Sequence, residues 1–225
     1  LTLRIAGQTL FGADLDGSAK DIGAALTVAL TTVNARFNRP FVLPWLFRRE
    51  NRLFRQALAT LDDLVYRIIR KRRASGDDRG DLLSMFMAAR DADTGETMND
   101  KQLRDEVMTM ILAGHETTAV ALTWALYLLD RNPEVADALR AKMAATFENR
   151  RPGMADLKAV PELGAVVQEV LRLYPPAWIF ARTPLADDAV GGYRIRAGSI
   201  VFISPWVTHR DPRFWPKPEQ FNPAR

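Results

Sequence analysis

A long apolar segment sets the strongest limit on how this chain can fold. Residues 99–131 are predicted to form one helix, about 50 Å long at about 1.5 Å per residue. Its central part, residues 107–129, is apolar on nearly every side, so in a water-soluble protein other elements must cover it all round. A membrane span is the rival interpretation, but His115, Glu116 and four threonines inside the segment disfavour it.

The rest of the chain up to about residue 180 also has a helical pattern. Apolar residues recur there every three or four positions. Asn99, Asp100 and Pro133 are helix-start signals. Helices are predicted at residues 1–12, 18–37, 49–74, 81–90, 99–131, 133–148 and 155–173.

The pattern changes from about residue 183. Residues 183–205 contain Gly-Gly followed by short runs of β-forming residues, which predict a small β-hairpin. Residues 206–225 are rich in proline and aromatic residues, which indicates the start of an irregular, packed loop region. The expected fold class is therefore mainly α, helical over 1–180, with a small β-hairpin region.

Composition excludes several kinds of site. The 225 residues include no cysteine, so they contain no disulfide, zinc–cysteine site or thiolate nucleophile. The net charge of +4 permits an acidic partner without requiring nucleic acid. The basic stretch 67–79 is interpreted as the solvated last turn of a helix, because cations are favoured there and Ser-Gly follows as a stop signal. No nucleic-acid partner is expected.

The segment AGHETT, residues 113–118, places small and polar residues inside the long helix. Ala113, Gly114 and Thr117 share one stripe, where another body can approach the backbone closely. Glu116 beside them must reach water, pair with a cation or have a raised pKa, which makes it a candidate proton carrier. Spacing alone favours a simpler interpretation, a close helix crossing with threonines bonded to carbonyls four residues back. A HExxH zinc site is excluded because Ala119 stands where the second histidine is needed.

Glu169 and Arg172 lie three residues apart on another predicted helix and can meet on one face. An exposed pair of this kind contributes little to stability. Its meaning changes if the pair is buried and a third charge joins it, since arginine suits a buried, bidentate partnership. The remaining histidine, His209, is interpreted as a loop residue.

Three motifs stand in a fixed order along the chain: AGHETT, then Glu169-x-x-Arg172 followed by LYPP, then FNPAR at 221–225. Together with the intervening sequence they resemble cytochrome P-450, the haem-thiolate monooxygenase family, and particularly its bacterial members. The resemblance covers essentially the whole chain. It implies a partial cytochrome P-450 fold, with residues 1–225 as the central part of one catalytic domain, and a cytoplasmic protein.

The resemblance also assigns roles to residues. Ala113 and Gly114 would lie over the distal face of haem b, with Thr117 as the oxygen-activating threonine and Glu116 as its acidic neighbour in proton delivery. Arg182 would hold a haem propionate. Two further groups follow from the resemblance: substrate contacts at Ala177, Ile179 and Phe180, and a buried structural cluster of Glu169, Arg172 and Arg225.

The implied reaction is hydroxylation of an apolar small molecule with dioxygen and two electrons from a redox protein, either a ferredoxin or a flavoprotein reductase. The family's iron-binding cysteine and its loop are absent from these residues, so no metal ligand is expected within them and the chain alone is expected to be inactive. The alternative is a non-catalytic helical or interaction protein that derives from this fold and binds no haem.

Overall fold

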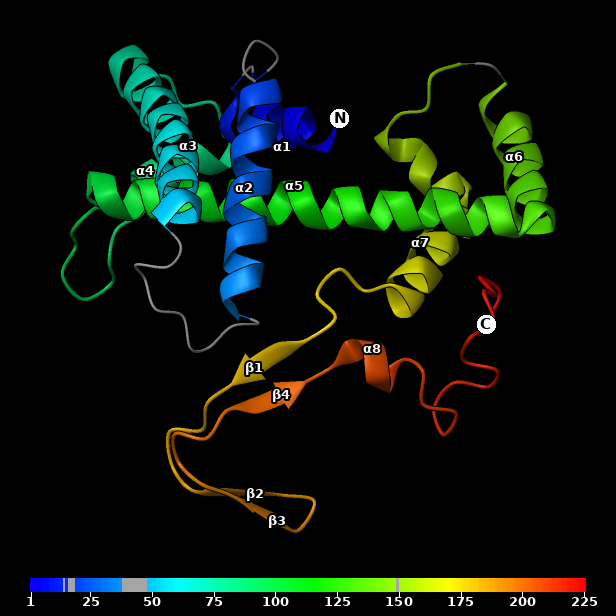
Figure 1. Cartoon of the computed structure of the whole chain (residues 1–225). Coiled ribbons are helices and arrows are strands. Elements are labelled where there is room, and N and C mark those ends of the chain that lie inside the picture. Colours follow the sequence, from blue (N-terminus) through cyan, green and yellow to red (C-terminus); the bar gives the residue numbers. More distant parts are fainter. Residues whose placement is uncertain (14, 16–18, 38–47, 149) are drawn as a thin grey trace. The chain divides into compact units, whose positions relative to one another are not determined.

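The computed structural model describes residues 1–13, 15, 19–37, 48–148 and 150–225 (Figure 1). These residues form two compact units, Leu1–Glu116 and Thr117–Arg225. The long helix α5 (Asp100–Arg131) contributes to both units. Most of the ordered elements are helices, and the strands are short, so the predicted mainly α fold with a small β region is confirmed.

The first unit consists of helices packed around one apolar core. They are α1 (Thr2–Phe11), α2 (Ala19–Phe37), α3 (Arg48–Ser75), α4 (Leu82–Ala88) and the first part of α5. Helices α2 and α3 pack against each other, and fully buried side chains from all five helices meet, among them Phe11, Ile22, Leu61, Leu83 and Val107. The predicted segments match these helices to within a few residues; the expected start at residue 18 lies outside the described residues.

Helix α5 begins with a reciprocal cap. The backbone N–H of Gln102 donates to Asn99 Oδ1 at 2.9 Å, and the backbone N–H of Asn99 donates to Gln102 Oε1 at 3.0 Å. This arrangement confirms the start signal at Asn99. Further along, Leu122 and Leu126 are exposed, so the described residues do not cover the apolar helix on every side. None of the described helices has the length and apolar character that a membrane crossing needs.

The second unit combines the end of α5 with α6 (Pro133–Phe147), α7 (Pro161–Leu173), the short α8 (Pro205–Thr208) and the 3-10 helix η3 (Met154–Ala159). Its core includes Leu128, Leu139, Val166, Val170 and Phe221. The prediction of one helix over 155–173 was wrong. Pro161 disfavours a helical conformation at Val160, whose φ is −127°, so η3 ends there and α7 begins.

The β region contains two antiparallel ladders. Strand β1 (Phe180–Arg182) pairs with β4 (Val201–Ile203), with Arg182 opposite Val201. Between them in the sequence, β2 (Asp188–Val190) pairs with β3 (Tyr193–Ile195) through a turn at Gly191 and Gly192, both with positive φ. The sequence predicted a single hairpin. The structure has an inner hairpin, β2–β3, and a second ladder, β1–β4, which is formed by the strands that flank it in the sequence.

Candidate functional site

The AGHETT segment lies within an unbroken α-helix. Ala113 is exposed, whereas Gly114 is half-buried against α1. A Cβ added to Gly114 would lie 3.5 Å from Leu10 Cδ1 and 3.7 Å from Ala6 Cβ. Gly114 therefore faces the neighbouring helix, as the close-crossing interpretation predicts, and Ala113 presents the open small surface.

The two charged or titratable side chains of the segment differ in exposure. The side chain of His115 is 21 % exposed and that of Glu116 is 51 % exposed. His115 Nδ1 has no hydrogen-bond partner among the described residues and lies 4.0 Å from Glu116 Oε2. Because the side chain of Glu116 is half exposed, it reaches water, which is one of the possibilities that the sequence left open for it.

Threonines of α5 show the back-bonding that spacing predicts. The hydroxyl of Thr109 donates to Asp105 O and that of Thr123 donates to Ala119 O, both at 2.8 Å. Neither bond interrupts the helix. Thr117 has an exposed side chain one position after Glu116. Thr117 and Glu116 are thus sequence neighbours on one helix, and both residues are exposed.

The structure brings Glu169, Arg172 and Arg225 into contact. Arg172 Nε and Nη2 donate to the two oxygens of Glu169 at 2.7 and 2.9 Å, a bidentate pair. Arg225 Nε and the backbone N–H of Asn222 each donate to Glu169 Oε1 at 2.9 Å. The side chains of Glu169 and Arg172 are only 3 % and 4 % exposed. This pair therefore differs from the exposed pair that spacing alone suggested.

The remaining donors of Arg172 fix the chain after α8. Its Nη1 donates to His209 O and to Pro218 O at 2.8 Å. Burial alone would raise the pKa of Glu169, but hydrogen bonds from Arg172 and Asn222, together with the charges of Arg172 and Arg225, outweigh it and hold this pKa below its ordinary value. The carboxylate is therefore ionised and fully partnered, which suits a structural centre and leaves no proton to transfer.

Arg182 and its neighbours lie at the start of the β region. Arg182 is exposed on β1, where its Nη1 donates to Ala181 O at 2.8 Å and its guanidinium lies over the Phe180 ring. Within the described ranges it has no carboxylate partner. Ile179 is half-buried, and Ala177 and Phe180 are exposed. Arg182 thus presents an unpaired cation beside apolar side chains.

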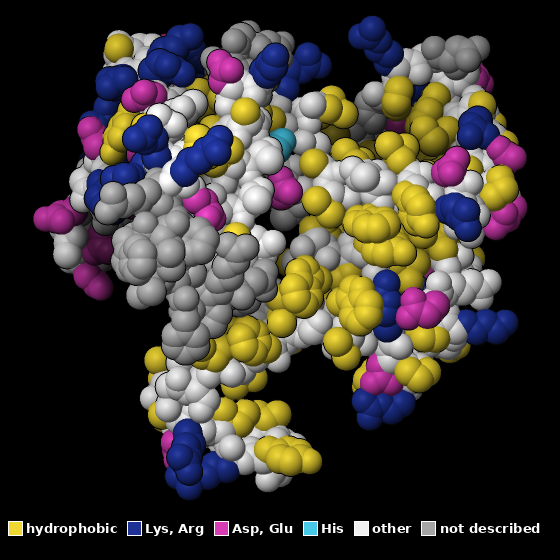
Figure 2. Space-filling view, in the orientation of Figure 1, with side chains coloured by type: hydrophobic (Ala, Val, Ile, Leu, Met, Phe, Trp, Pro, Cys, Tyr) yellow, Lys and Arg dark blue, Asp and Glu magenta, His cyan; other side chains and the backbone are white. Residues whose placement is uncertain are grey.

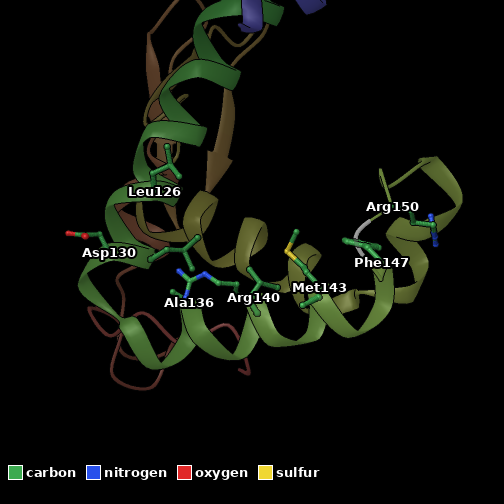
Figure 3. Close-up of a pocket in the computed structure, with 10 residues that line it drawn as sticks. Leu126, Asp130, Ala136, Arg140, Met143, Phe147 and Arg150 are labelled. Carbon is green, nitrogen blue, oxygen red and sulfur yellow. The ribbon is translucent and has the colours of Figure 1, made fainter.

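A hollow of about 700 Å³ lies in the second unit, between the end of α5 and α6 (Figure 3). Leu126, Met143 and Phe147 line it together with Arg140 and Arg150. None of the residues that the sequence assigns to the site lines this hollow. It is therefore separate from the residues considered so far.

Sequence reasoning missed a second buried ion pair, in the first unit. Arg72 donates through both Nη atoms to Asp81, whose side chain also caps α4 by accepting from Ser84 N. The side chains of Arg72 and Asp81 are 5 % and 8 % exposed. The basic stretch 67–79 was interpreted as solvated, and for Arg72 that interpretation was wrong. Helical spacing could have found it, because Arg72 lies three residues after the buried Ile69 and seven after the buried Val65, on the apolar stripe of α3.

Comparison with known proteins decides the family. The sequence model described as "Cytochrome P450" matches residues 1–225. The chain belongs to the cytochrome P-450 family. This cytochrome P-450 chain is 42 % identical to cyclooctatin synthase and 35 % identical to cyclooctat-9-en-7-ol 5-monooxygenase, both of Streptomyces melanosporofaciens, and 31 % identical to pentalenene oxygenase of Streptomyces avermitilis. Each match covers 100 % of this chain and 50 % of the relative. The chain spans about half the length of the curated relatives it matches.

The residues of this cytochrome P-450 chain fit the haem of the family in part. The exposed guanidinium of Arg182 suits a carboxylate such as a propionate, and Ala113 offers a small, open surface on α5. An iron ligand of the thiolate type is not among these 225 residues, which include no cysteine. The part of the chain that the structure describes also contains no cluster of three or more acidic or histidine side chains that could hold a metal.

Proposed function

We propose that this cytochrome P-450 chain is the central part of the catalytic domain of a haem-dependent monooxygenase, which hydroxylates an apolar organic substrate with dioxygen and two electrons. The family match over all 225 residues carries the proposal. The names of two relatives, a 5-monooxygenase and an oxygenase, support the reaction class.

The haem, when bound, supplies the oxygen chemistry. Ala113, Gly114 and Arg182 are the residues of this chain that we propose hold it. Ala113 leaves space on the exposed side of α5, and Gly114 lets α1 pack closely behind that surface. Arg182 offers donors to a propionate, because no carboxylate among the described residues occupies its guanidinium.

Proton handling is assigned to Glu116 and Thr117. The carboxylate of Glu116 is half exposed and can exchange protons with water. The Thr117 hydroxyl is both a donor and an acceptor, so it can hold a water molecule or pass on a proton at Oγ1. The carboxylate takes protons from solvent, and the hydroxyl delivers them.

The substrate is proposed to contact Ala177, Ile179 and Phe180. Their apolar side chains favour an apolar compound over a charged one. The names of two relatives give pentalenene and cyclooctat-9-en-7-ol as the compounds on which those proteins act. We propose a substrate of the same unsaturated hydrocarbon or alcohol type. A ferredoxin or a flavoprotein reductase is the proposed electron donor.

The coupling of electron use to product formation tests this assignment. In the full-length gene product, Thr117→Ala should lower the yield of product per electron and raise peroxide release, because the proton-delivering hydroxyl is lost. Thr118→Ala removes a neighbouring hydroxyl from the same helix and should leave coupling unchanged. Equal coupling in the two variants would remove Thr117 from its role. A full-length protein that takes up no haem would instead support the non-catalytic alternative.

A further inference from the structure

A cavity of about 350 Å³ lies in the first unit, where the end of α1 meets the C-terminal half of α3. Its apolar wall is formed by side chains that also belong to the core. Phe11, Leu15 and Leu64 are at most 5 % exposed, and Ile68 lies beside them on α3. A wall of this kind is fixed by packing and does not depend on a ligand.

Two of the cations that line the cavity, Arg72 and Arg79, already bind other groups of the protein. Besides pairing with Asp81, Arg72 donates to Phe11 O at 3.0 Å. Arg79 donates to Gly12 O at 3.0 Å and lies 3.4 Å from Asp77. These guanidiniums thus satisfy carbonyl groups at the C-terminus of α1.

The other two cations that line the cavity are Arg67 and Lys71. Both are exposed, both line the cavity, and neither has a hydrogen bond or an ion pair with any described residue. They lie four residues apart on α3, where like charges repel each other. The helix dipole favours cations near the end of α3, but it does not explain why two unpaired cations border a cavity that has an apolar wall.

We propose that this cavity binds a small amphipathic organic anion. A phosphate or carboxylate head group accepts hydrogen bonds from Arg67 and Lys71, and the apolar part lies against Leu15, Leu64 and Ile68. Phosphate and carboxylate are the groups that arginine and lysine recognise most strongly. The volume is at the lower end of the range for small-molecule sites, about 300–1,000 Å³. None of the residues proposed to hold haem lines the cavity, so the site goes beyond the monooxygenase function.

Figure 2 shows Lys and Arg side chains gathered over α3, so a test must separate this cavity from the general basic surface. Arg52 and Arg70 lie on the same helix, are exposed and do not line the cavity. The double variants R67Q/K71Q and R52Q/R70Q therefore remove the same charge from the same helix. Far-ultraviolet circular dichroism and the Soret spectrum establish that both variants fold and hold haem alike.

Calorimetric titration of the full-length, haem-loaded protein with hexyl phosphate, inorganic phosphate and hexanol tests the proposal. Hexyl phosphate should bind more tightly than either of the other probes, because only it has both the head group and the tail. R67Q/K71Q should weaken hexyl phosphate binding about tenfold or more through loss of charge-assisted hydrogen bonds, and R52Q/R70Q should not. Equal affinity of the two double variants, or equal binding of hexyl phosphate and inorganic phosphate, would overturn the proposal.

Vesicles then distinguish the two sources of such an anion. If the protein sediments with phosphatidylcholine vesicles that contain phosphatidic acid, and R67Q/K71Q abolishes this, the site takes a lipid head group. If hexyl phosphate binds but the vesicles do not retain the protein, the site takes a free anion.

Discussion

The buried cluster around Glu169 makes the sharpest stability prediction. Glu169→Ala leaves Arg172, only 4 % exposed, without its bidentate partner and removes an acceptor from Arg225 and from Asn222 N. Breaking a buried pair by removing one partner costs about 3–5 kcal/mol, because a buried charge is left uncompensated. Since a domain is stable by only about 5–15 kcal/mol, this loss is a large part of the total. Glu169→Gln keeps one acceptor oxygen and should cost less.

Urea unfolding of the full-length protein, followed by tryptophan fluorescence, measures this loss. Trp215 is a suitable reporter because its ring centre lies 5.3 Å from Arg172 Cζ. Glu162→Ala is the matched control: it removes a carboxylate from the same helix that is 51 % exposed, with Lys142 Nζ at 3.9 Å. Such an exposed pair is worth about 1 kcal/mol or less. If Glu169→Ala and Glu162→Ala shifted the urea midpoint equally, the cluster would not stabilise the fold as argued.

Four further results are expected. Because the pKa of Glu169 lies below its ordinary value of 4.5, its stabilisation is complete above about pH 4.5 and is lost as the pH falls through the lowered pKa. The urea midpoint of the native protein should therefore fall more steeply with acidification than that of Glu169→Gln; parallel pH profiles would contradict this. Gly114→Ala should be tolerated, since its Cβ would make contacts of 3.5 and 3.7 Å, whereas Gly114→Leu should cost about 1–3 kcal/mol in thermal or urea unfolding. Asn99→Ala should cost about 1 kcal/mol in the same assay, through loss of the cap. Arg182→Ala should speed haem transfer to apomyoglobin, with Arg182→Lys intermediate because lysine keeps the charge but not the fork of donors; unchanged transfer would remove Arg182 from haem binding.

Helix positions could be predicted from the sequence because their signals are local. Asn99 and Gln102 can form a reciprocal cap whatever the rest of the chain does, and Pro133 occupies a first helical position. The same kind of signal was overlooked at Pro161, which separates η3 from α7. The second β ladder was missed because β1 and β4 pair across about twenty residues, and no short-range pattern reports such a pairing.

The candidate site was less predictable because burial and facing direction depend on tertiary packing. Spacing placed Ala113 and Gly114 on one stripe, yet only the position of α1 decides that Gly114 packs inward and Ala113 stays open. Spacing likewise allowed Glu169 and Arg172 to meet, but their burial depends on carbonyl groups more than thirty residues away in the chain. Arg72 differs, because its spacing from the buried Val65 and Ile69 already places it on the apolar stripe of α3, and only its partner Asp81 lies beyond the helix.

The reduced spectrum with carbon monoxide tests the central claim most directly. If this chain is part of a haem-thiolate monooxygenase, the full-length protein should show the red-shifted Soret band of thiolate ligation, and the 225-residue chain, which contains no cysteine, should not. A full-length protein without this band, or the same band from the 225 residues alone, would contradict the account.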